Sequence, residues 1–169
     1  MAISALRGIE LMASKKEQPV LTLMVGLPCS GKTTLAKKLE RETNAVRFTP
    51  DEWHIFLFGN DFHVDDGHDQ RHDQIEALMW KLGRELLTKG ISVILDFGFW
   101  AKEQRDEKRA EAKALGAKVQ ICYLDTPLSE LLLRLEQRNQ TGTEVFTTIT
   151  PEDIKEWSSI FQPPEKEEL

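Results

Sequence analysis

One octapeptide, GLPCSGKT at residues 26–33, constrains the fold more than any other part of the sequence. It matches the spacing GxxxxGK[ST], in which the two glycines let the backbone wrap closely around a phosphate with its N–H groups facing inward. The apolar run before it, Val20–Val25, is typical of a strand buried on both faces, and Lys32–Thr43 after it has helical spacing. This strand–loop–helix context predicts a phosphate-binding loop rather than a chance match.

The loop and the start of the helix after it predict a binding site for a nucleoside triphosphate, with ATP and Mg²⁺ as the expected cofactors. Lys32 is expected to reach the β- and γ-phosphates, and the Thr33 hydroxyl to ligate Mg²⁺. Thr34 is a further candidate contact to the α-phosphate. The predicted phosphate-binding residues are Gly26, Leu27, Pro28, Cys29, Ser30, Gly31, Lys32, Thr33 and Thr34.

Strand-like apolar runs alternate with helical patterns along the whole chain. The predicted strands are residues 20–25, 45–48, 91–95 and 118–124, and the predicted helices are residues 32–43, 51–58, 68–89, 102–115, 127–138 and 151–160. Such alternation predicts an α/β protein with the three-layer P-loop NTPase fold, a parallel sheet flanked by helices. Ligands of such sheets bind at the carboxyl ends of the strands.

The predicted domain organisation is an N-terminal extension (residues 1–19), one domain (residues 20–162) and a loosely held tail (residues 163–169). The sequence leaves open whether residues 1–11 are native structure or an appendage. Thr150 is a good N-cap for the last helix. The polar segment 139–150 is the natural lid.

Asp96 follows the apolar run at residues 91–95 and is expected to close that strand. A carboxylate at this point would lie near the Mg²⁺ beside the loop, in the Walker B role. The alternative is an ordinary aspartate in a turn. Phe97 follows where motor ATPases commonly carry a water-activating glutamate, which favours transfer to a substrate over hydrolysis.

Asp51 follows the short second strand and is the candidate base for an acceptor hydroxyl. Its alternative role is that of a helix N-terminal aspartate stabilised by the helix dipole, and the two roles are compatible. Glu52 is the nearest substitute.

Three arginines are candidate ligands for the transferred phosphoryl group. Arg105 lies one turn into the helix after Asp96, while Arg134 and Arg138 share one face at the end of a later helix. The alternative for the last two is surface pairing with Glu130 or Glu136.

An acidic, histidine-rich stretch contains His63, His68 and His72. His68 and His72 have metal-ligand spacing, but no third ligand stands at a fixed spacing, so a wall of the acceptor pocket is the more useful interpretation. Such a wall would favour a cationic or sugar-like acceptor. Trp53 and Trp100 are candidates to stack on an acceptor ring, with core packing as the default.

Charge and cysteine content limit the partners and the compartment. The net charge of −6 disfavours binding to long nucleic acid, which calls for a basic face. Neither Cys29 nor Cys122 has metal-ligand spacing, and no apolar run reaches the length of about 20 residues that spans a bilayer. With no signal peptide recognisable, the expected location is the cytoplasm, without a membrane partner.

Four segments together resemble the small P-loop kinases, a family that includes zeta toxins, chloramphenicol phosphotransferases and the kinase domain of polynucleotide kinases. They are GLPCSGKTTLA, TPDEW, VILDFGFW with Arg105, and YLDTPLSELLLRLEQRN, and the resemblance runs from about residue 20 to residue 157. It implies that the first loop binds ATP, that Asp51 activates the acceptor hydroxyl, and that Arg134 and Arg138 are lid arginines.

One departure from this family concerns the acceptor. Polynucleotide kinases and zeta toxins tend to carry DxxR after the second strand, and His54 stands here where that arginine would be. We therefore expect an ATP-dependent kinase acting on a small-molecule hydroxyl of a nucleoside, sugar or antibiotic. The alternatives are a polynucleotide or nucleotide kinase and a non-catalytic ATP-binding regulatory module. No guanine-reading NKxD motif is present. The sequence leaves the acceptor and the oligomeric state open.

Overall fold

A computed structural model describes residues 18–61, 67–141 and 149–169. His63 and most of the segments 1–19 and 139–150 lie outside these ranges. Within them, strands and helices alternate as predicted. The elements are β1 (Val20–Val25), α1 (Lys32–Thr43), β2 (Val46–Phe48), α2 (Pro50–Phe58), α3 (His68–Thr88), β3 (Val93–Gly98), α4 (Lys102–Ala114), β4 (Lys118–Tyr123), α5 (Leu128–Thr141) and α6 (Pro151–Ile160).

The strands form one parallel sheet in the order β2-β3-β1-β4. Leu23 of β1 pairs with Leu95 of β3 on one side and with Ile121 of β4 on the other. Because β1 is an inner strand, the loop that follows it emerges near the middle of the sheet edge formed by the carboxyl ends.

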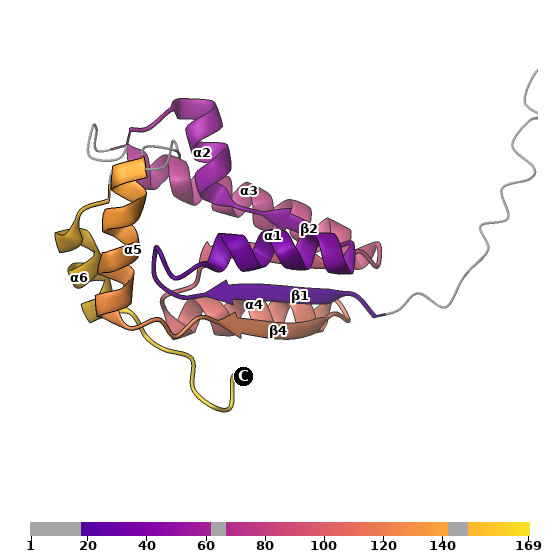
Figure 1. Cartoon of the computed structure of the whole chain (residues 1–169). Coiled ribbons are helices and arrows are strands. Elements are labelled where there is room, and N and C mark those ends of the chain that lie inside the picture. Colours follow the sequence, from indigo (N-terminus) through magenta and orange to yellow (C-terminus); the bar gives the residue numbers. More distant parts are fainter. Residues whose placement is uncertain (1–17, 62–66, 142–148) are drawn as a thin grey trace, which may run out of the picture.

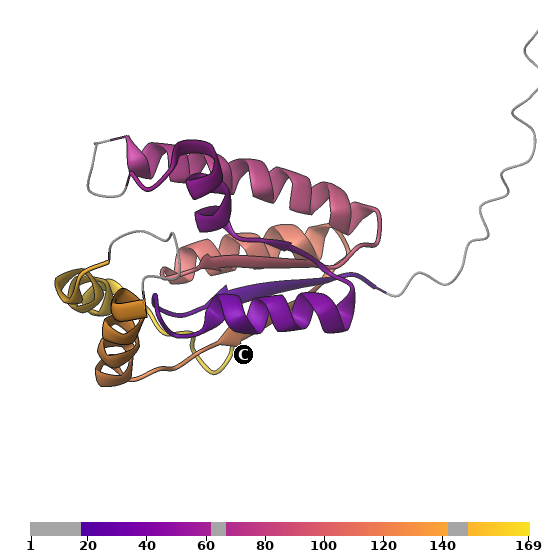
Figure 2. The ribbon, with the colours of Figure 1, turned by 45° about the horizontal axis from the view of Figure 1, so that its top comes forward.

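Alternate residues of the sheet pack against opposite helical layers, which confirms the three-layer prediction. Leu21 and Leu23 of β1 belong to a buried cluster with Met79 of α3 and Ala112 of α4. Met24 faces the other way, into a cluster with Ala36 of α1. Figure 2 shows α1 and α3 on opposite sides of the sheet. None of the described helices is both long and apolar enough to cross a membrane.

Helices α5 and α6 lie beyond the carboxyl ends of β1 and β4 (Figure 1). They enclose a third buried cluster formed by Leu27, Leu131, Leu135, Ile149 and Ile154. Thr150 caps α6 as predicted, because its hydroxyl accepts a hydrogen bond from the Asp153 N–H at 3.2 Å. Leu27 ties the loop after β1 into this cluster.

Two elements, β3 and α5, differ from their predicted ranges by more than one residue at an end. Strand β3 starts at Val93 and continues to Gly98, so Asp96 lies within the strand instead of closing it. The cause is pairing with β1, since Val25 stands opposite Gly98 and the Gly26 N–H donates to the Gly98 carbonyl at 3.1 Å. Helix α5 continues past its predicted end at residue 138 to Thr141.

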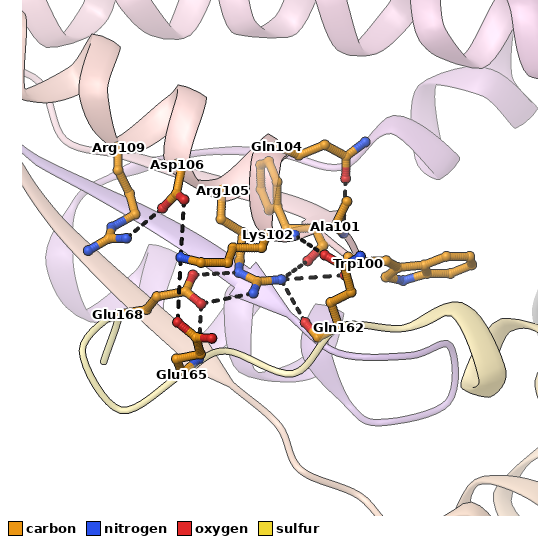
Figure 3. Close-up of polar contacts among 11 residues, drawn as sticks. Trp100, Ala101, Lys102, Gln104, Arg105, Asp106, Arg109, Gln162, Glu165 and Glu168 are labelled. Carbon is orange, nitrogen blue, oxygen red and sulfur yellow. Dashed lines mark hydrogen bonds and ion pairs between the residues drawn. The ribbon is translucent and has the colours of Figure 1, made fainter.

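The prediction of a loosely held tail is wrong. Glu168 is buried and accepts hydrogen bonds from Arg105 Nε at 2.8 Å and Nη2 at 3.0 Å. Arg105 Nη1 also donates to the carbonyls of Phe99 and Gln162. Figure 3 shows the tail lying against the start of α4 around this fully buried guanidinium. A buried cation needs such a partner, and the tail supplies it.

Glu168→Gln is expected to lower the free energy of unfolding by about 3 kcal/mol, because it leaves the buried Arg105 without a compensating charge. The hydrogen bond from Arg105 lowers the pKa of Glu168 from 4.5 to about 2. A lowered carboxyl pKa stabilises the fold above the unfolded value, so the difference between parent and variant should shrink as the pH falls from about 4.5 towards 2.

Urea unfolding across this pH range measures both effects. Glu167→Gln serves as the control because Glu167 is exposed. Equal stability of parent and Glu168→Gln at pH 7 would contradict a structural role for the buried pair.

Candidate active site

The glycine-rich loop between β1 and α1 turns sharply at its two ends. Gly26 has φ 145° and Gly31 has φ 97°, conformations that residues with a Cβ rarely adopt. A Cβ on Gly26 would lie 3.1 Å from both the Leu124 carbonyl oxygen and the Ser30 hydroxyl. The loop is therefore packed tightly enough that its first position requires glycine.

Several polar groups of this loop and the helix after it are left for a ligand. Among the described residues, no protein acceptor takes the N–H groups of Gly31, Lys32, Thr33 and Thr34, and no side chain caps α1. The buried hydroxyl of Ser30 also has no partner within the described ranges. Open amides at a helix N-terminus form a cradle suited to phosphate.

Lys32 lies across this loop, with its Nζ donating to the Leu27 carbonyl at 2.8 Å. Burial lowers its pKa, while the charges of Asp96 and Asp51 act in the opposite direction. The ammonium is thus held close to two carboxylates and the open amides. A cation in this position can contact the phosphates of a nucleotide.

Asp96 presents an unused oxygen beside the loop. Its Oδ2 accepts a hydrogen bond from the Thr49 hydroxyl at 3.2 Å, whereas the buried Oδ1 has no partner among the described residues. Burial raises the pKa of Asp96, and the hydrogen bond from Thr33 and the charge of Lys32 oppose the rise. Oδ1 and the adjacent Thr33 hydroxyl are the oxygen ligands that Mg²⁺ prefers, so the residues present fit that ion.

Asp51 stands in the first turn of α2, directly after the N1 proline. Its Oδ1 accepts a hydrogen bond from His72 Nε2 at 3.2 Å. Partial desolvation raises its pKa, but His72, Lys32 and Arg138 outweigh this, so the pKa of Asp51 lies below its usual value. The carboxylate of the neighbouring Glu52 forms ion pairs with Lys37 and Arg47 instead.

The three predicted arginines have three different placements. Arg134 contacts Glu130 at 2.9 Å and the Ser30 carbonyl at 3.1 Å, so it braces the loop from its carbonyl side. The charge of Arg138 reaches Asp51. Arg105 is not brought to the site, and the expectation that it points there is wrong, because its guanidinium is enclosed by the C-terminal tail.

The histidine-rich region forms a hydrogen-bonded cluster around Asp61, which sequence reasoning missed. Oδ1 of Asp61 lies 2.6 Å from His54 Nε2 and 2.7 Å from His68 Nδ1, and Oδ2 is bound by Arg71. Two imidazoles and a carboxylate at these distances have a metal-like arrangement. Metal-bound imidazole normally donates its other N–H, however, and His54 Nδ1 is buried without a partner in the described chain. Because Arg71 already binds the Asp61 carboxylate, the cluster fits a hydrogen-bonded network with compensated charge better than it fits a metal site.

Both tryptophans proposed to stack on an acceptor have protein partners. Trp53 meets Phe48 edge-on, with ring centroids 6.2 Å apart. Trp100 packs against Trp157 at 5.4 Å. Trp53 is nevertheless 37% exposed, so it is not fully enclosed by the protein.

The AAA_33 family model, described as an AAA domain, matches residues 21–164. The chain belongs to this family. The match covers nearly the whole described domain, from β1 to the start of the tail, and ends before Glu168. The resemblance to small P-loop kinases drawn from four sequence segments is thereby confirmed. A comparison with curated proteins finds no match.

Solved structures similar to this AAA_33 protein share its fold. A chain of the Pnkp1/Rnl/Hen1 RNA repair complex superposes with a TM-score of 0.66 at 23% identity, covering 84% of this chain and 43% of that one. Chaetomium thermophilum Kti12, in complex with ADP-AlF3, gives 0.64 at 20% identity and covers 86% and 81%. A gluconokinase from Sinorhizobium meliloti 1021 gives 0.61 at 17% identity and covers 89% and 79%. These likenesses confirm the P-loop kinase fold of the AAA_33 chain.

Proposed function

We propose that the protein is an ATP-dependent kinase that transfers the γ-phosphoryl group to a hydroxyl of a small molecule. The observation that carries the proposal is the set of open amides in the loop beside Lys32, whose Nζ donates to the Leu27 carbonyl at 2.8 Å, and beside Asp96, whose buried Oδ1 has no partner among the described residues. Phosphoryl transfer is catalysed mainly by positioning and charge, and it uses a cation, a metal-binding carboxylate and an acceptor-orienting carboxylate. Kti12 with ADP-AlF3 on the same fold supports a nucleotide as ligand.

In the proposed reaction, the amides of the loop and Lys32 hold the phosphates of ATP. The acceptor oxygen bonds to the γ-phosphorus as the bond between that phosphorus and the bridging oxygen breaks, and the electron pair leaves with ADP. Asp51 takes the proton of the acceptor hydroxyl. Thr33 and Asp96 would hold Mg²⁺, which when bound neutralises charge on the phosphates. In this proposal Arg138, whose charge reaches Asp51, compensates charge near that residue.

Two features favour a small acceptor. His54 occupies the DxxR arginine position, is 2% exposed and points at Asp61, so it offers little to an acceptor phosphate. The net charge of −6 opposes a long polyanion. The fold shared with a gluconokinase is compatible with this class of acceptor.

The two free cysteines, Cys29 and Cys122, suit the reducing cytoplasm that we propose as the location of the protein.

One observation favours the second candidate, a polynucleotide kinase. Arg71 of α3 donates a hydrogen bond to Asp61, the same carboxylate that His54 contacts. A guanidinium is therefore present near His54, which stands at the position of the arginine in the DxxR pattern. The fold is also shared with a chain of an RNA repair complex.

ADP release above the no-acceptor background separates these functions. Purified protein with Mg-ATP is offered nucleosides, sugars and hydroxyl-bearing antibiotics in one set, and 5′-hydroxyl RNA and DNA oligonucleotides in another. We expect stimulation within the first set and none within the second. Stimulation by oligonucleotides alone would replace the small-molecule proposal, and no stimulation by either set, with ATP bound, would favour a regulatory module.

A further inference from the structure

His72 lies between two carboxylates on adjoining helices. From α3, its Nε2 lies 3.2 Å from Asp51 Oδ1 on α2. One turn further along α3, Glu76 Oε1 lies 3.7 Å from the other ring nitrogen, Nδ1. The His72 side chain is 25% exposed, compared with 62% for Asp51. The partly buried imidazole of His72 is thus hydrogen-bonded to the more exposed carboxylate of Asp51.

The groups around His72 make it a more stable cation than an isolated histidine. Burial lowers its pKa, but the hydrogen bond to Asp51 and the charges of Glu76 and Asp73 raise it above the usual value. The rings of His54 and His68 lie 6.0 Å away and contribute further polar neighbours. Burial raises the pKa of Glu76 to about 7, so this carboxyl changes charge near neutrality.

We propose that His72 is a positioning residue that holds one oxygen of Asp51, so that the other oxygen takes the proton of the acceptor. Glu76 steadies the imidazole from behind. This inference rests on the proposed kinase function and deepens it, because it names the group that orients the base. His72 keeps its own proton throughout, while the acceptor proton moves to Asp51 Oδ2 as the new oxygen–phosphorus bond forms.

Asp51 needs such a positioning residue because its side chain is 62% exposed. Without a partner its carboxylate would rotate freely, and the hydrogen bond from His72 to one oxygen restricts that rotation. The other oxygen, Oδ2, then points at the acceptor hydroxyl for more of the time, which raises the fraction of complexes that can react. An ordinary surface hydrogen bond would stabilise the helix pair without affecting this fraction.

The test compares His72→Ala with His72→Gln, which keeps an N–H donor but loses the charge. We expect kcat to fall about 10- to 100-fold in His72→Ala, with ATP affinity unchanged, and to recover in large part in His72→Gln. Gln70→Ala is the matched control, because Gln70 is exposed on the same helix. Thermal unfolding of each variant shows whether a lost rate reflects lost structure.

The pH profile of kcat provides a readout that a purely structural role would not move. His72 lowers the pKa of Asp51, so removing its charge lets that pKa rise. Activity that depends on ionised Asp51 is lost as the pH falls, and the acidic limb should therefore shift to higher pH in His72→Gln.

Three outcomes decide the proposal. A reduced kcat with a shifted limb supports it. An unchanged kcat and profile in folded His72→Ala overturns it but leaves the kinase proposal intact if Asp51→Asn is inactive. Full activity of Asp51→Asn removes both the proposed mechanism and the role of His72.

Discussion

Asp51→Asn is expected to bind ATP as the parent does and to transfer phosphate about 10² to 10⁴ times more slowly. The substitution keeps the size and the polar contact to His72 but removes the proton acceptor. In the proposed mechanism Lys32 and the open amides hold ATP on the loop side of the site, so the affinity for ATP should not fall. ATP titration by calorimetry and initial rates with the best acceptor measure the two quantities separately.

Glu52→Gln is the matched control for this variant. Glu52 follows Asp51 in the same helical turn, but its carboxylate pairs with Lys37 at 2.9 Å and with Arg47 at 3.1 Å. Its removal should leave the rate within a few-fold of the parent. Equal rates for parent and Asp51→Asn would exclude Asp51 from the mechanism, and a large loss in Glu52→Gln alone would move the base to its neighbour.

Lys32→Ala is expected to weaken ATP binding and to lower the transfer rate by at least about 100-fold, because it removes a preorganised cation from the phosphate site. The protein itself should not be destabilised. Burial lowers the pKa of Lys32, which means that its charge is held at a cost in the free protein. Thermal unfolding without nucleotide should therefore give a Tm no lower than that of the parent.

The control for Lys32→Ala is Lys38→Ala, on the same helix. Lys38 is exposed and lies 3.9 Å from Glu42, a surface pair that contributes little. Both binding and rate should stay at the parental level in the control. Unchanged ATP affinity in Lys32→Ala would count against the phosphate site.

The fold was predictable because its signals are local. The run Val20–Val25 forms a buried inner strand of the sheet. The last helix begins at Pro151, directly after its N-cap residue Thr150. Alternating apolar segments are sufficient to predict a parallel sheet with helices on both faces. The exception is β3, whose three extra residues, 96–98, depend on pairing with β1, which lies far away in the sequence.

The site was predictable in part. Lys32 lies at the end of the loop that follows β1, and Asp96 lies in the carboxyl-terminal half of β3, so the topology alone brings them to one edge of the sheet. Asp61 and Glu168 carry no comparable signal, because their importance arises from partners on other elements. Arg105 shows the limit most clearly, since its spacing from Asp96 suggested a phosphate ligand, but a glutamate 63 residues later binds it.

The central claim is that the open amides at the start of α1 bind a triphosphate. An NMR titration of ¹⁵N-labelled protein with Mg-ATP tests it directly, by following the amide resonances of Gly31, Lys32, Thr33 and Thr34. The account predicts large saturable shifts of these resonances at one common Kd. Resonances that do not move while ATP binds elsewhere, or that do not move at any ATP concentration, would contradict it.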